Sequence, residues 1–112
     1  MAKNLKVTKK HNPGIYDSET GKDCVAEKVV NITSDCPGAS KQNSCILIFT
    51  RAKRGRIVQI RQGCSSVHFF VGELDSEMRV APRDDTFGSR ANMLGLDKSA
   101  LRELIEMHAP SA

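Results

Sequence analysis

The sequence contains no tryptophan, one tyrosine and four phenylalanines, so aromatic residues make up only 4% of the chain. A core dominated by aromatic side chains is therefore excluded, and we expect valine, isoleucine, leucine and methionine to fill it. At 112 residues the chain is long enough for one domain with one hydrophobic core. Two domains would each be too small to fold without disulfides or a metal ion.

Long apolar runs are also missing. No stretch approaches the length of a membrane-spanning helix, and the N-terminus lacks the apolar segment of a secretory signal. We therefore expect an intracellular protein, cytoplasmic or nuclear, without a membrane partner. The sequence has no phosphate-binding glycine loop, zinc-protease helix or EF-hand loop, and we expect no cofactor.

The four cysteines are spaced too widely for an ordinary structural zinc site. Cys24, Cys36, Cys45 and Cys64 follow one another at intervals of 12, 9 and 19 residues, without a C-x-x-C pair. Such pairs are usual in zinc sites because one tight turn presents two thiolates to the ion. We expect most of these cysteines to be buried, reduced side chains with no metal bound. A zinc site and disulfides are the less favoured alternatives.

One pair of residues, Cys64 and His68, has the chemistry of a nucleophile and a base. A base needs a third group to orient it, and no aspartate or asparagine is evidently placed for that role. A single histidine in a strand is more often packed or exposed than catalytic. The sequence therefore predicts that the protein is not an enzyme.

Acidic residues are absent from residues 1–10 and 51–62. The first stretch carries four lysines, and the second carries five basic residues: Arg51, Lys53, Arg54, Arg56 and Arg61. From Glu73 onward, acidic residues outnumber basic ones by eight to five, and the formal net charge of the chain is +4. The resulting uneven electric field favours a polyanionic partner over a neutral one.

The hydrophobic pattern divides the chain into a flexible basic N-terminal tail, residues 1–22, and a single α+β domain, residues 23–112. A strand is expected over residues 23–32. The sheet itself is expected to be antiparallel and to have about four strands, two in a hairpin and two more over residues 67–71 and 78–81.

The hairpin joins a β-branched run over residues 45–50 to an alternating run over residues 57–61. A three-residue turn ending at Gly55 predicts a register that pairs Thr50 with Val58 and Ile48 with Ile60. One face of the hairpin then belongs to the core, formed by Ile46, Ile48, Val58 and Ile60. The opposite face mixes apolar side chains, among them Phe49, with arginines.

Residues 82–92 are expected to form a polar loop, and one amphipathic helix follows at the C-terminus. Asp97 is a good N-cap, and Leu101, Leu104 and Ile105 recur at helical spacing on one face. A single helix covers only one face of a small sheet. The other face is apolar enough to predict a homodimer.

Nucleic acid, most plausibly single-stranded, is the partner that these features favour. Phosphates need a track of lysine and arginine, and unpaired bases need flat side chains on which to stack. The hairpin is expected to supply both through Phe49, Arg51, Lys53, Arg54, Arg56 and Arg61, with Phe69 or Phe70 on the neighbouring strand. The alternative is a small protein-interaction module or inhibitor that binds a protein partner through its exposed sheet face.

Residues 45–108 resemble the transcriptional coactivator "positive cofactor four" family of single-stranded DNA-binding proteins. Cys45–Gln62 is similar to the basic hairpin of that family, with a Lys/Arg-Gly turn before an Ile-Val-Gln-Ile-Arg strand, and Gly95–Ile105 is similar to the start of its helix. The resemblance implies a role in transcription regulation, with the five basic residues on phosphates. It also implies a dimer interface formed by Leu101, Leu104 and Ile105.

Overall fold

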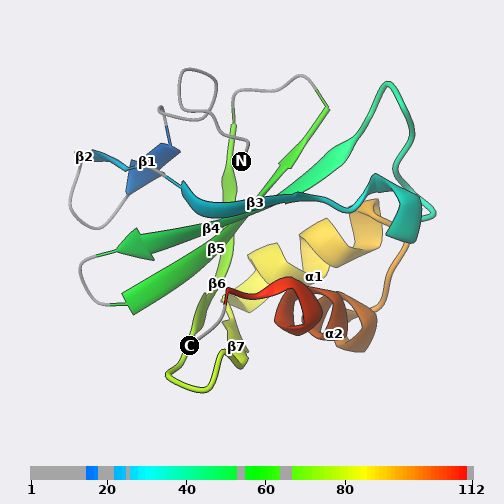
Figure 1. Ribbon diagram of the computed structural model, residues 1–112. Helices are drawn as coiled ribbons and strands as arrows, with labels where there is room; N and C mark the ends of the chain where they lie inside the picture. Colours follow the sequence, from blue (N-terminus) through cyan, green and yellow to red (C-terminus); the bar gives the residue numbers. More distant parts are fainter. Residues whose placement is uncertain (1–14, 18–21, 25, 53–54, 64–66, 111–112) are drawn as a thin grey trace.

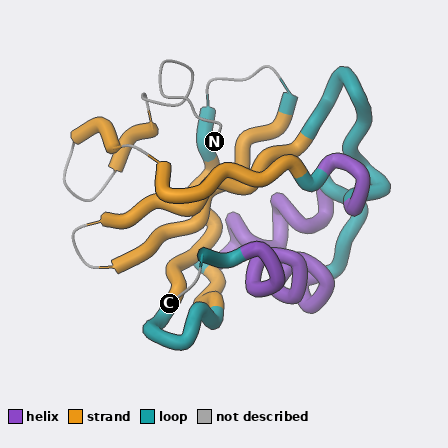
Figure 2. Tube along the Cα trace, in the orientation of Figure 1, coloured by secondary structure: helices purple, strands orange, loops and turns teal. Residues whose placement is uncertain are grey.

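The protein is described by a computed structural model at residues 15–17, 22–24, 26–52, 55–63 and 67–110. A five-stranded antiparallel sheet forms one layer, and two helices form the other (Figure 1). Both helices gather on the same side of the strands (Figure 2). The α+β prediction is confirmed.

The main sheet is a meander in which each strand pairs with its neighbour in the sequence. Its order is β3 (Ala26–Asn31), β4 (Cys45–Ala52), β5 (Gly55–Gln62), β6 (Phe69–Leu74) and β7 (Val80–Pro82). A separate two-stranded ribbon consists of β1 (Ile15–Asp17) and β2 (Lys22–Cys24). Part of the stretch predicted as a tail is therefore paired strand.

A single 3₁₀ turn, η1 (Thr33–Asp35), follows β3, and two α-helices follow β7. The first, α1 (Asp84–Met93), lies in the segment predicted as a polar loop, so the prediction of one helix is wrong. The helix buries Phe87 and Ala91, and Leu94 is buried at its C-cap. These three apolar residues, four and three positions apart, give a weaker signal than the longer apolar stripe of a typical helix.

The second helix, α2 (Lys98–His108), begins as predicted. The carboxylate of Asp97 accepts a hydrogen bond of 2.8 Å from the backbone N–H of Ala100. Leu101, Leu104 and Ile105 then face the core together. The N-cap and the apolar stripe were both readable because each depends on local spacing alone.

The register of the central hairpin differs from the predicted one by one residue. Thr50 pairs with Ile57 and Ile48 pairs with Gln59, because Ala52 pairs with Gly55 across a two-residue turn. Shifting a register by one residue exchanges the faces of one strand relative to the other. Leu47, Phe49, Val58 and Ile60 therefore face the helices. Ile48, Thr50, Ile57 and Gln59 occupy the opposite side, which we call the outer face.

The C-terminal end of α1 forms a backbone hydrogen bond to the loop that follows η1. Gly95, with φ of 75°, ends the helix in a Schellman motif, since Leu96 N–H donates to Ala91 O and Gly95 N–H donates to Asn92 O. Gly38 N–H donates a 2.8 Å hydrogen bond to Leu94 O. A Cβ atom at Gly38 would collide with the backbone of Met93 and Leu94, so only glycine fits there.

Candidate nucleic-acid interface

The turn end of the hairpin carries two adjacent arginines, Arg51 and Arg56, directly opposite each other on β4 and β5. Like charges in that position repel. Glu27 of β3 offsets the repulsion, because its two carboxylate oxygens accept hydrogen bonds of 2.8 and 3.1 Å from Arg56. These bonds raise the pKa of Arg56 above its usual value. Arg56 is thus committed to an internal ion pair, whereas Arg51 is exposed.

The predicted phosphate-binding residues do not form one surface. Strand alternation places Arg51 and Arg56 on the helix side, while Arg61 lies on the outer face at the other end of β5. The five residue steps from Arg56 to Arg61 span about 17 Å of extended strand. Lys53 and Arg54 lie outside the described residues.

Phe49 was expected to offer its ring to a nucleic-acid base, and that prediction is wrong. Its side chain is fully buried in the core beneath the helices. The one-residue change of register places Phe49 on the side of β4 that the two helices cover. A stacking platform must therefore come from another aromatic residue.

Arg61 has two neighbours on the outer face that the sequence did not assign to a site. Gln59 pairs with Phe70 of β6, and His68 lies two residues before Phe70. Burial lowers the pKa of His68, and the nearby positive charge of Arg61 lowers it further. Arg61, His68 and Phe70 are each partly exposed.

Arg83 adds a second cation beside this group. Its guanidinium carbon lies 4.5 Å from the ring centroid of Phe70, at the point where β7 leads into α1. Its backbone N–H donates a 2.8 Å hydrogen bond to Val71 O, which fixes the start of the side chain. Arg61, His68, Phe70 and Arg83 form what we call the basic corner.

Two buried polar groups lie on the same outer face. Thr50 is 0% exposed and Gln59 is 5% exposed, yet within the described part of the chain neither Thr50 Oγ1 nor Gln59 Oε1 has a hydrogen-bond partner. Buried polar atoms are normally satisfied because an unpaired one costs about 1–3 kcal/mol. Gln59 lies opposite Phe70 of the basic corner, whereas Thr50 lies nearer the hairpin turn, opposite Ile57.

The second arginine–aromatic contact of the described residues belongs to the helix side. Arg90 of α1 lies 3.9 Å from the ring centroid of Phe69, which packs against the core. Phe69 and Phe70 thus point to opposite faces of β6. Only Phe70 is placed beside Arg61, because a bulge in β6 sets its register against β5.

The residues predicted to form a dimer interface are part of the chain's own core. Leu101 and Ile105 are fully buried, and Leu104 is nearly so, against the sheet and α1. The helix stripe was read correctly as apolar, but a second copy cannot reach it in this arrangement. That assignment of the interface is therefore wrong.

Two of the four cysteines have described side chains, and both are buried and free. The thiols of Cys36 and Cys45 hydrogen-bond each other. Burial raises the pKa of Cys36 and raises that of Cys45 to about 12. Both therefore stay protonated at neutral pH, and the described part of the chain has no group of side chains that could hold a metal ion. Cys64 lies outside the described residues.

The sequence left Phe69 and Phe70 as alternative stacking rings, and it gave no binding role to His68 or Arg83. The composition around Phe70 gave no reason to prefer it over Phe69, since the choice depends on the bulge. Arg83 was assigned to a loop because α1 had not been recognised. The predicted hairpin already placed Arg61 on the face opposite the core, which was the one available signal.

No family model matches the chain, and searches of curated proteins and of solved structures also found no match. Among the described residues, no helix is long and apolar enough to cross a membrane. The resemblance to the "positive cofactor four" family stays a prediction. The residues themselves therefore carry the functional inference.

Proposed function

We propose that the protein binds single-stranded nucleic acid through the basic corner. The observation that carries the proposal is the pairing of an arginine with a partly exposed aromatic ring, Arg83 over Phe70, beside a second free arginine, Arg61. Bases stack on aromatic rings and on guanidinium planes, and phosphates bind the charges of arginine. Duplex DNA offers its phosphates but keeps its bases stacked, so single strands should bind more tightly.

The arginines of the basic corner are better placed to bind phosphate than Arg56 near the hairpin turn, because Arg56 is ion-paired with Glu27. The ion pairs of the described residues are Arg56–Glu27 and Arg79–Glu106, so Arg61 and Arg83 are not neutralised. Arg51 is exposed and supplies an additional phosphate contact on the other side of the sheet. Nucleic-acid binding of this kind would suit a regulator of transcription, as the family resemblance implies.

Fluorescence anisotropy with labelled single- and double-stranded oligonucleotides tests the proposal. Arg61→Glu/Arg83→Glu should weaken binding at least tenfold at low salt, because it reverses two phosphate contacts. Lys41→Glu/Lys98→Glu changes the net charge equally at exposed positions outside the basic corner, and should have a much smaller effect. An equal loss of affinity in the two variants would show that binding depends on net charge and not on the basic corner. No binding by the wild type at low micromolar protein would refute the proposal.

His68 gives a second readout. A bound phosphate near His68 stabilises its charged form, so the pKa of His68, lowered in the free protein, should rise on binding. By linkage, affinity should increase as the pH falls from 7 to 5. The His68→Gln variant should lose this dependence. Retention of the full pH dependence in that variant would place the anion elsewhere.

A protein-interaction role is the second candidate. The observation favouring it is the exposure of two methionines, Met93 at 52% and Met107 at 67%, on the two helices. Methionine side chains adapt to apolar partners. An interface of that kind should tolerate high salt, whereas phosphate binding should weaken steeply.

A further inference from the structure

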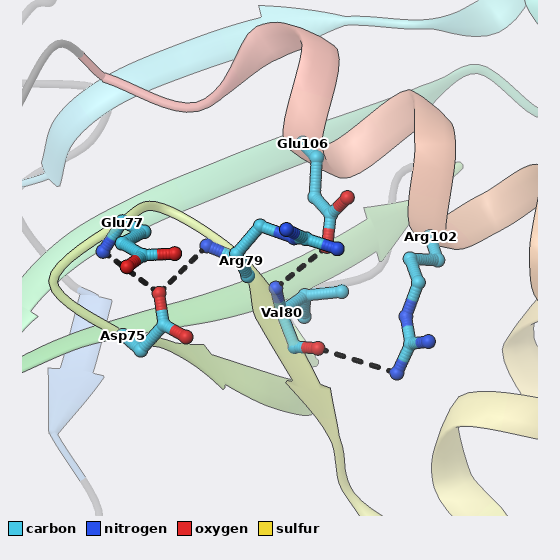
Figure 3. Close-up of polar contacts among 6 residues, drawn as sticks. All are labelled: Asp75, Glu77, Arg79, Val80, Arg102 and Glu106. Atoms are coloured by element: carbon cyan, nitrogen blue, oxygen red, sulfur yellow. Dashed lines mark hydrogen bonds and ion pairs between the residues drawn. The ribbon is translucent and has the colours of Figure 1, made fainter.

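The two outer strands of the sheet differ in what their unpaired backbone groups contact. Just after β7, Arg83 N–H donates to Val71 O of β6. Backbone groups alternate in direction along a strand, so those of Ala81 point toward β6 and those of Val80 and Pro82 point away from the sheet. Glu106 of α2 accepts a 2.8 Å hydrogen bond from Val80 N–H, and Arg102 donates one of 3.4 Å to Val80 O. Figure 3 shows both side chains reaching the strand from the helix. We call this the capped edge.

The capped edge is closed in other ways as well. Pro82, the second outward-facing residue of β7, has no N–H to offer a further strand. The turn before β7 is fixed by Asp75, whose carboxylate accepts hydrogen bonds from the backbone of Glu77 and Arg79. Those bonds hold the pKa of Asp75 below its usual value. The sheet therefore cannot grow past β7.

At the other side, β3 pairs only with β4 within the described sheet. Ile32 N–H donates a 2.9 Å hydrogen bond to Cys45 O, so by alternation Val30 and Lys28 bond to β4. Val29 and Asn31 consequently point both their N–H and their C=O away from the sheet. No hydrogen bond within the described residues uses these four groups, and we call this the open edge.

We propose that the open edge is a homodimer interface, in which β3 of a second copy pairs antiparallel across a two-fold axis at Val30. This register sets Val29 opposite Asn31 of the other copy, so that all four outward groups of each copy bond. A register centred on Val29 would oppose Asn31 to the bulge between Ala26 and Lys28, and one centred on Asn31 would oppose Val29 to the 3₁₀ turn. Only the pairing at Val30 satisfies every group.

The side chains favour the same arrangement. Val30 is a half-buried apolar residue packed against the core cluster, and the axis would place it directly against its own copy. In a non-hydrogen-bonded antiparallel pair the two Cα atoms are about 4.5 Å apart, close enough for the valines to pack. The two copies of Lys28 would lie four residues apart along the strands and avoid each other.

Assembly through this edge must stop at two copies. A two-fold interface uses the same patch on both molecules, and the five-stranded sheet, as far as the structure describes it, has one such edge. The ten-stranded sheet that results would end at a capped edge on both sides. The dimer predicted from the sequence thus acquires an interface on β3 in place of α2.

Residue-resolved amide hydrogen exchange on the full chain, at low and high protein concentration, tests the proposal together with sedimentation equilibrium. We expect a reversible dimer whose formation slows exchange at Val29 and Asn31. The amide of Val30 is bonded to β4 in either state and serves as an internal control. A monomer at hundreds of micromolar, or a dimer in which exchange at Val29 and Asn31 is unchanged, would overturn the interface.

A pair of substitutions at one position adds a second test. Val29→Pro removes an outward N–H without touching the pairing to β4, and by symmetry it deletes two bonds per dimer. The dissociation constant should rise about tenfold or more. Val29→Thr retains the N–H and the branched shape and should dimerise like the wild type. Undiminished dimerisation of folded Val29→Pro would contradict the proposal, and the exchange measurement decides the matter if that variant does not fold.

Discussion

The two flanks of the sheet are held to the rest of the molecule by different chemistry. On the β7 flank, charged side chains of α2 bind the strand backbone, through Glu106 and Arg102. On the β3 flank, Glu27 pairs with Arg56 inside the sheet, but the turn and loop that follow the strand are held by neutral contacts. The hydroxyl of Thr33 accepts from Cys45 N–H, the Cys36 and Cys45 thiols meet, and the backbone of Gly38 packs on α1.

The difference shows what each kind of contact can do for a strand at the edge of a sheet. Long charged side chains reach around the outside of β7 and occupy its free backbone groups. The neutral contacts beyond β3 attach the following turn and loop to the core, but they leave the outward groups of β3 unoccupied. Stability and closure of an edge are therefore separate properties.

The largest expected effect is on the neutral flank. Gly38→Ala should destabilise the protein by about 2–4 kcal/mol, because the new Cβ would meet the carbonyl oxygen of Met93 and lie 2.8 Å from the carbonyl carbon of Leu94. Urea unfolding measures the change, with the exposed Lys41→Ala as control. A loss below about 0.5 kcal/mol would mean that the loop is not held against α1.

High pH should also weaken the neutral flank. Burial raises the pKa of Cys45 from 9.0 to about 12, so the unfolded chain releases the thiol proton before the folded chain does. The thiol's contribution is therefore complete below pH 9 and is lost as the pH rises toward 12, by an amount on the order of 2–3 kcal/mol.

Urea unfolding at a series of pH values from 8 to 11 measures that loss. The Cys45→Ala variant is less stable overall but lacks the thiol, and its unfolding free energy should fall less over this range. Parallel curves for the wild type and Cys45→Ala would show that other groups cause the alkaline loss.

On the charged flank, Glu106→Ala should cost about 1–3 kcal/mol, because it leaves the partly buried Val80 N–H without an acceptor. Glu106→Gln keeps an oxygen at the same position and should recover most of the loss. The Ala variant also frees the Val80 N–H of the capped edge, so light scattering should detect larger species than the wild type forms. The comparison of the two edges would fail if Glu106→Ala were as stable and as small as the wild type.

The smallest effect is expected for Arg79, whose guanidinium lies 3.9 Å from Glu106 at an exposed position. Exposed ion pairs contribute little in water, and Arg79→Ala should change stability by less than about 0.5 kcal/mol. Thermal unfolding at low and high salt would measure this. A larger, salt-dependent loss would indicate that Arg79 holds Glu106 in place for Val80.

How far the sequence predicted these features depended on how local each signal was. The N-cap at Asp97 and the stripe of α2 depend on neighbours within one turn, and both were correct. The sheet strands followed from short apolar runs. The hairpin register depended on a choice between a two- and a three-residue turn, and one residue was enough to assign the wrong inward-facing residues to β4.

The candidate site was harder to predict because it is assembled by long-range packing. Nothing near Phe49 in the sequence shows that two helices cover it. The position of Phe70 beside Arg61 depends on a bulge, and that of Arg83 depends on where α1 begins. Arg56 looked like a free cation until the sheet brought Glu27, 29 residues away, within 2.8 Å.

The meander order of the sheet has a consequence for how fast the protein reaches this structure. Each strand from β3 to β7 pairs with the next strand of the chain, and the longest connection to close is residues 32–44, between β3 and β4. Rates of folding fall as contacts become more distant in sequence. We expect the refolding of this chain to belong to the millisecond range typical of mixed α/β domains, with successive hairpins added from either side of the β4–β5 turn.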